Sequence, residues 1–117
     1  MLGDPRQFIL DRGGHIFFAR LNGSVAGTFA LLKNDDDVYE LSKMAVAESF
    51  QGMKVGNRMM EYCIEKVIAL GGKKIILFSN TKLLPAIHLY TKYGFKEVPM
   101  NSSQYTRSNI KMERIIK

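Results

Sequence analysis

Hydrophobic and polar positions form short strand-like runs in the first part of the chain. The runs lie at residues 15–21, 25–33 and 38–46. Asn22-Gly23 separates the first two runs, and this dipeptide between apolar runs is the strongest short-range signal for a hairpin. A polar turn at 34–37 precedes the third run. We therefore expect an antiparallel meander of three strands. Residues 1–12 show no clear period, so no element is predicted there.

The hydrophobic period then changes to that of a helix. Val55, Met59, Cys63, Val67 and Leu70 recur on one helical face, and two glycines follow as a helix end. The remaining elements are a nearly continuous apolar strand at 74–79, a second helix at 84–93, and closing strands at 95–98 and 109–116 around a polar loop.

This order of elements predicts the class of fold. A strand, a helix and a further strand that follow one another form a parallel crossover, whereas the meander before them is antiparallel. We expect an α/β fold, with helices packed on one mixed sheet. The length of 117 residues suits a single domain that covers 1–117.

Composition narrows the class of protein. The chain is 46% hydrophobic and 24% charged, which is a globular balance. No apolar run approaches the ~20 residues that span a bilayer, so no membrane partner is expected. A single cysteine, Cys63, permits no internal disulfide, and no metal site is expected. These features favour a soluble protein of the cytoplasm.

The net charge of +6 favours an anionic partner, either nucleic acid or a phosphorylated ligand. No basic run with interleaved aromatic residues is present, so nucleic acid is an unlikely partner.

A glycine-bearing segment precedes the first predicted helix. Its residues are Gln51, Gly52, Met53, Lys54, Val55, Gly56 and Asn57. Such a turn directs backbone N–H groups outward at the positive end of a helix, where a pyrophosphate can bind, and Lys54 adds a cation. A tight strand-to-helix turn without a ligand would have the same sequence. The spacing matches neither a P-loop nor a dinucleotide fingerprint.

This segment resembles the acetyl-CoA pyrophosphate loop of the GCN5-related N-acetyltransferase (GNAT) superfamily. Gln51 and Gly56 match the first and last places of the family's motif, whereas Lys54 stands where the middle glycine is usual. Residues 41–46 (LSKMAV) are similar to the family's central strand. A second family signature is matched by Ala86, Leu89, Tyr90, Lys92, Gly94 and Phe95. Together the matches cover roughly residues 14–98.

The resemblance implies a GNAT-like acyl-CoA N-acyltransferase fold that is N-terminally shortened. Members usually begin with a strand and two helices, and about a dozen residues stand in their place here. It also implies an N-acetyltransferase that uses acetyl-CoA as co-substrate and transfers the acetyl group directly to an unidentified small-molecule or peptide amine. The alternative is a catalytically idle CoA-binding regulatory domain, because the missing helices normally form much of the acceptor wall.

The resemblance assigns roles to individual residues. Glu40 is the expected base for the amine, and Tyr90 is the expected acid for the departing thiolate. The backbone of Met44, Ala45 and Val46 is expected to pair with the pantetheine arm like an added strand. Asn80 is a candidate hydrogen-bond partner of the cofactor, and Lys92 a candidate for its 3′-phosphate.

An expectation about assembly follows from the short N-terminus. If 15–21 is the first strand, it is a sheet edge with open N–H and C=O groups. The sheet face that two helices usually cover would also be partly bare, so we expect a homodimer or larger homo-oligomer. The alternative is that residues 1–12 fold back over the edge.

Overall fold

A computed structural model describes residues 8–13, 16–34, 37–101 and 108–116. Its elements, in chain order, are β1 (Phe8–Gly13), β2 (Ile16–Leu21), β3 (Ser24–Lys33), β4 (Val38–Val46), the short 3-10 helix η1 (Glu48–Phe50), α1 (Val55–Ala69), β5 (Lys74–Ser79), α2 (Leu84–Lys92), β6 (Lys96–Val98) and β7 (Ile110–Ile115). The predicted strands and helices are confirmed to within two residues at the ends that the structure describes. The predicted start of the first strand at residue 15 and residues 102–107 of the predicted polar loop lie outside the described residues.

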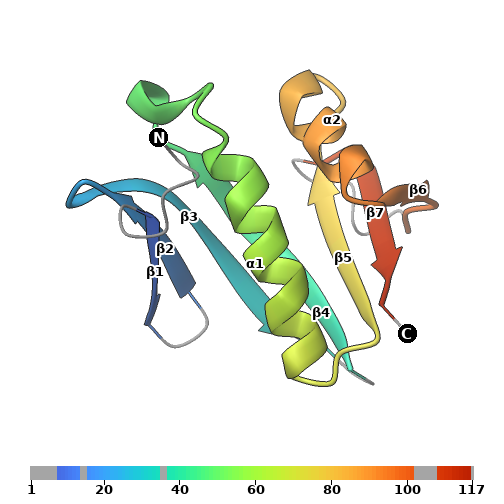
Figure 1. The fold of residues 1–117 in the computed structure, drawn as a ribbon. Helices are drawn as coiled ribbons and strands as arrows, with labels where there is room; N and C mark the ends of the chain where they lie inside the picture. Colours follow the sequence, from blue (N-terminus) through green and yellow to red (C-terminus); the bar gives the residue numbers. More distant parts are fainter. Residues whose placement is uncertain (1–7, 14–15, 35–36, 102–107, 117) are drawn as a thin grey trace.

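The strands form one seven-stranded sheet in the order β1-β2-β3-β4-β5-β7-β6. β4 and β5 are parallel, and the other neighbouring strands are antiparallel. Both helices lie on the same face of the sheet (Figure 1). The mixed α/β sheet and its parallel crossover through α1 are therefore confirmed.

Local sequence explains the turn between β2 and β3. Asn22 and Gly23 have φ values of 54° and 80°, the left-handed pair that a two-residue hairpin turn requires. On the two strands that this turn joins, Phe17 of β2 and Phe29 of β3 stack with ring centroids 4.9 Å apart, and both rings contact Tyr62 of α1. The predicted hairpin therefore begins the core.

The apolar face of α1 is buried as the period predicts, with one exception. Val55, Met59, Cys63 and Val67 are all buried, whereas Leu70 is 48% exposed. The helix ends at Ala69, so Leu70 no longer follows its face.

The N-terminal prediction was wrong. Residues 8–13 form β1, which pairs with β2 in the antiparallel register Phe8↔Leu21 to Gly13↔Ile16. The expectation of an open edge at 15–21 is therefore also wrong, and the alternative, in which N-terminal residues fold back over this strand, is confirmed for residues 8–13. β1 is the sheet edge in its place. β1 is stabilised by its backbone hydrogen bonds to β2. A short segment without alternating apolar residues gives no sign of such pairing in its own sequence.

Two irregularities in β4 separate it from β5 near the centre of the sheet. The ladder between β4 and β5 runs from Val38↔Lys74 to Leu41↔Leu77, whereas β4 continues to Val46. Lys43 has a φ of 56° and bulges where the register with β3 shifts. β4 and β5 therefore diverge beyond Leu41, as the ribbon also shows (Figure 1).

Candidate active site

Two cavities adjoin where β4 and β5 diverge. The first, called here the loop cavity, has a volume of about 540 Å³ and lies between the end of β4, the turn before α1 and helix α2. The second, called here the strand cavity, has a volume of about 600 Å³ and lies between β4 and β5. Met44 and Tyr90 line both, so the two cavities meet at these side chains.

The turn before α1 has the backbone of an anion-binding loop. Gly52 and Lys54 have φ values of 84° and 62°, and α1 begins at Val55 directly after them. The first N–H groups of a helix have no acceptor in a preceding turn, and they carry its partial positive charge. Lys54 occupies a left-handed position that favours glycine, and its exposed side chain leaves the backbone N–H groups accessible.

Gly56 brings α1 close to α2. A Cβ atom at this position would lie 3.0 Å from Cδ2 of Leu89 and 3.8 Å from Cγ2 of Val46. All three residues line the loop cavity. A side chain at residue 56 would therefore narrow the cavity or push Leu89 aside.

Polar side chains join the two helices beside the loop cavity. Lys92 Nζ donates to Oδ1 of Asn57 at 2.8 Å. Tyr93 Oη lies 3.1 Å from Oε2 of Glu61 and 3.2 Å from the same Asn57 oxygen. The phenol has one proton, and we assign it to the Glu61 carboxylate, because charge-assisted bonds are stronger. Burial and this hydrogen bond to Glu61 raise the pKa of Tyr93.

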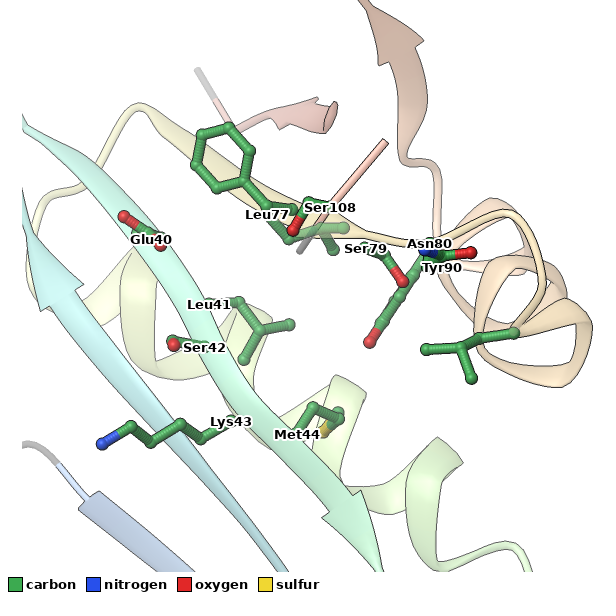
Figure 2. A pocket seen from close by; sticks show the side chains of 12 residues that line it. Glu40, Leu41, Ser42, Lys43, Met44, Leu77, Ser79, Asn80, Tyr90 and Ser108 are labelled. Carbon is green, nitrogen blue, oxygen red and sulfur yellow. The ribbon is translucent and has the colours of Figure 1, made fainter. Parts of the chain in front are cut away.

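Tyr90 reaches the junction of the cavities from α2. Its side chain is 7% exposed, and its ring centroid lies 6.0 Å from that of Phe95. Figure 2 shows the hydroxyl directed into the space between β4 and β5. Burial, with a smaller contribution from the neighbouring Cys63 thiol, raises the pKa of Tyr90. The phenol therefore keeps its proton at neutral pH and can donate it.

Glu40 and Asn80 line the strand cavity from β4 and from the end of β5. The side chain of Glu40 leaves β4 on the side away from Tyr90 (Figure 2). Asn80 Oδ1 accepts a hydrogen bond from the backbone N–H of Lys82 at 2.9 Å, which holds the turn before α2. This contact gives Asn80 a structural role in addition to its place in the cavity wall.

Most of the predicted site residues lie around the loop cavity. The loop cavity is lined by Met44, Ala45, Val46, Gln51, Gly52, Lys54, Val55, Gly56 and Asn57, and also by Tyr90. Met53 and Lys92 are not among the lining residues, although Lys92 bonds to Asn57.

Several lining residues were not predicted from the sequence. In the loop cavity they are Phe50, Pro85, Ala86 and Leu89, and in the strand cavity they are Leu41, Ser42, Lys43, Leu77, Phe78, Ser79, Leu83 and Ser108. Ala86 and Leu89 belong to the second signature and lie close to Tyr90 in the sequence. This proximity could have identified them as lining residues. Ser108 is brought to β5 only by the antiparallel pairing of β7.

The described residues include no group of three or more histidine, cysteine, aspartate or glutamate side chains arranged to hold a metal ion. Among the same residues, no helix has both the length and the apolar character needed to cross a bilayer.

Comparison of the sequence with known proteins finds similarity to one family of enzymes. Residues 2–95 match the model of the acetyltransferase (GNAT) family. YvbK of Bacillus subtilis (strain 168), named as an uncharacterized N-acetyltransferase, is 30% identical over 99 residues, which are 82% of this chain and 64% of YvbK. The chain therefore spans less than two thirds of this curated relative.

Solved structures show the same fold. Ard1 from Thermoplasma volcanium aligns with a TM-score of 0.79 and 27% identity, over 88% of this chain and 71% of Ard1. A GNAT family acetyltransferase from Elizabethkingia anophelis, solved with acetyl-CoA bound, aligns with a TM-score of 0.74 and 23% identity, over 86% of this chain and 74% of that protein.

Proposed function

Because this chain belongs to the acetyltransferase (GNAT) family, we propose that it transfers an acetyl group from acetyl-CoA directly to an amine. The observation that carries this proposal is the junction of the two cavities at a buried, protonated tyrosine. The loop cavity offers backbone donors for an anion, and the strand cavity offers room for an acceptor. The acetyl-CoA bound to the Elizabethkingia anophelis protein supports the choice of co-substrate.

The lining of the loop cavity suits the chemistry of acetyl-CoA. The N–H groups at the start of α1 and the Lys54 ammonium would hold the pyrophosphate. The part of β4 beyond Leu41, at Met44 to Val46, has left the ladder with β5 and would pair with the amide-rich pantetheine arm. To reach a phosphate of the cofactor, the Lys92 ammonium would have to break its hydrogen bond with Asn57.

The protein side chains would supply the proton transfers. Bound acetyl-CoA brings an activated acetyl group as a thioester. Glu40 would take the proton of the acceptor ammonium through water, since its side chain points away from Tyr90. Tyr90 would donate its proton to the departing sulfur. Burial raises the pKa of the Cys63 thiol to about 12, so this thiol is not a nucleophile at neutral pH and direct transfer is favoured.

Turnover against a panel of amines tests this function. We expect free thiol to be released from acetyl-CoA in the presence of an acceptor, and a Kd for CoA in the micromolar range by calorimetry. Binding without turnover of any amine would support the idle regulatory domain instead. Failure to bind CoA would exclude both functions.

A substitution at Gly56 tests the place of the cofactor. Gly56→Val should weaken CoA binding by ~1–3 kcal/mol, because the new side chain meets Leu89 and displaces the donors at the start of α1. Ala69→Val adds a similar branched side chain at an exposed position of the same helix and should leave the affinity unchanged. Unchanged calorimetric affinity in folded Gly56→Val protein would contradict the assignment.

We further propose that the chain self-associates through the sheet face away from the helices. Ile16 and Leu32 are 40% and 43% exposed, at positions that alternate with the core residues Phe17 and Leu31. Light scattering over a concentration series should give a mass that rises above the 13.3 kDa of one chain. A constant monomer mass at high micromolar concentration would refute self-association. A cytoplasmic location stays a prediction from the sequence.

A further inference from the structure

We propose that the acceptor is a small zwitterion, an amine that carries a carboxylate a few bonds away, as free amino acids do. This inference rests on the proposed function and concerns the strand cavity. The described residues that line this cavity include one acid, Glu40, and one base, Lys43. The other polar side chains of the lining belong to Ser42, Ser79, Asn80, Tyr90 and Ser108.

The bulge in β4 places the two charges on one side of the strand. Before the bulge, Tyr39 and Leu41 face the core, and after it Met44 and Val46 do. The left-handed residue Lys43 absorbs the change of register, so Ser42 and Lys43 both point away from the core.

Figure 2 shows this arrangement directly. Glu40, Ser42 and Lys43 leave β4 on one side of the strand. Leu41 and Met44 leave it on the other side, toward Tyr90. Lys43 therefore joins Glu40 and Ser42 on one side, an arrangement that regular alternation would not allow.

The two charges are available to a ligand. Within the part of the chain that the structure describes, the ion pairs are Lys33–Asp37, Arg58–Glu61 and Lys74–Glu113, and neither Glu40 nor Lys43 takes part in them. Three residues of a strand span about 10 Å, and the long lysine side chain can shorten that distance. An ammonium beside Glu40 and a carboxylate beside Lys43 would complement both charges in one small molecule.

The same lining disfavours other amines. Polyamines and aminoglycosides carry several positive charges. The single carboxylate of Glu40 cannot neutralise all of them, and the Lys43 ammonium would repel them. An apolar amine would place apolar atoms against the charged groups of Glu40 and Lys43 and would complement neither of them. A volume of about 600 Å³ accommodates an amino acid together with water.

Matched pairs of acceptors test the inference. The substrates would be amino acids with α- or ω-amino groups, each compared with its own carboxamide, with thiol release from acetyl-CoA as the readout. We expect at least one acid to exceed its carboxamide about tenfold or more in kcat/KM, the scale of one charge-assisted hydrogen bond. Lys43→Met should bring this ratio close to one. Lys96→Met, which removes an exposed lysine from β6 at the far edge of the sheet, should preserve it.

The possible outcomes test the zwitterion inference and the acetyltransferase function separately. Efficient turnover of carboxamides or of spermidine without preference for a carboxylate would overturn the inference and keep the acetyltransferase. If no amine is turned over, binding of the same pairs to the CoA-saturated protein is measured by calorimetry. A carboxylate preference that Lys43→Met abolishes would then support the zwitterion site alone, and no preference would overturn it.

Discussion

Replacing Tyr90 by phenylalanine should lower turnover about 10²–10⁴-fold and leave the affinity for acetyl-CoA nearly unchanged. This is the usual contribution of a general acid. The hydroxyl lies at the junction of the two cavities, and its raised pKa keeps the proton in place at neutral pH. The ring would still fill its site against Phe95, so the fold should survive the change. Steady-state kinetics together with calorimetry would measure both effects.

Tyr62→Phe is the matched control. Tyr62 lies on α1 and packs its ring edge-on against Phe17, with centroids 5.6 Å apart. Loss of this hydroxyl should not affect turnover. Undiminished turnover in Tyr90→Phe would remove Tyr90 from the mechanism, and an equal loss in both variants would indicate a general effect on the core.

Alkaline pH should destabilise the protein through Cys63. The pKa of this buried thiol is about 12 in the folded state, raised by burial from an ordinary value of 9.0. Between these values the unfolded chain loses the thiol proton and the folded chain keeps it. Stability is therefore fully present below pH 9 and is lost as pH rises toward 12. Three pH units at ~1.36 kcal/mol per unit give an upper bound of about 4 kcal/mol.

Urea unfolding at several pH values would measure this loss. Cys63→Ala should lower the stability at neutral pH, because it leaves a cavity in the core, and should flatten the decline above pH 9. Tyr90→Phe should also reduce the decline, above pH 10, since the pKa of that phenol is raised as well. An identical pH dependence in wild type and Cys63→Ala would show that the thiol does not contribute.

The sequence determined those parts of the fold that depend on local pattern. The Asn22-Gly23 turn, the buried face of α1 at Val55 to Val67, and the apolar strand β5 were all predicted, because each follows from neighbouring residues. Most of the loop cavity was predicted for the same reason. Its residues come from two short segments that adjoin the parallel crossover.

Only the tertiary structure decided the features that depend on distant pairing. β1 is a strand because β2 pairs with it, and its own residues show no period. Lys92 bonds to Asn57 across 35 residues of sequence, which no local pattern records. The strand cavity opens because the ladder between β4 and β5 ends at Leu41. Lys43 lines that cavity on the same side of β4 as Glu40 and Ser42 because a non-glycine residue takes a left-handed conformation in the middle of a strand. Local propensity disfavours such a conformation, so the surrounding sheet must impose it.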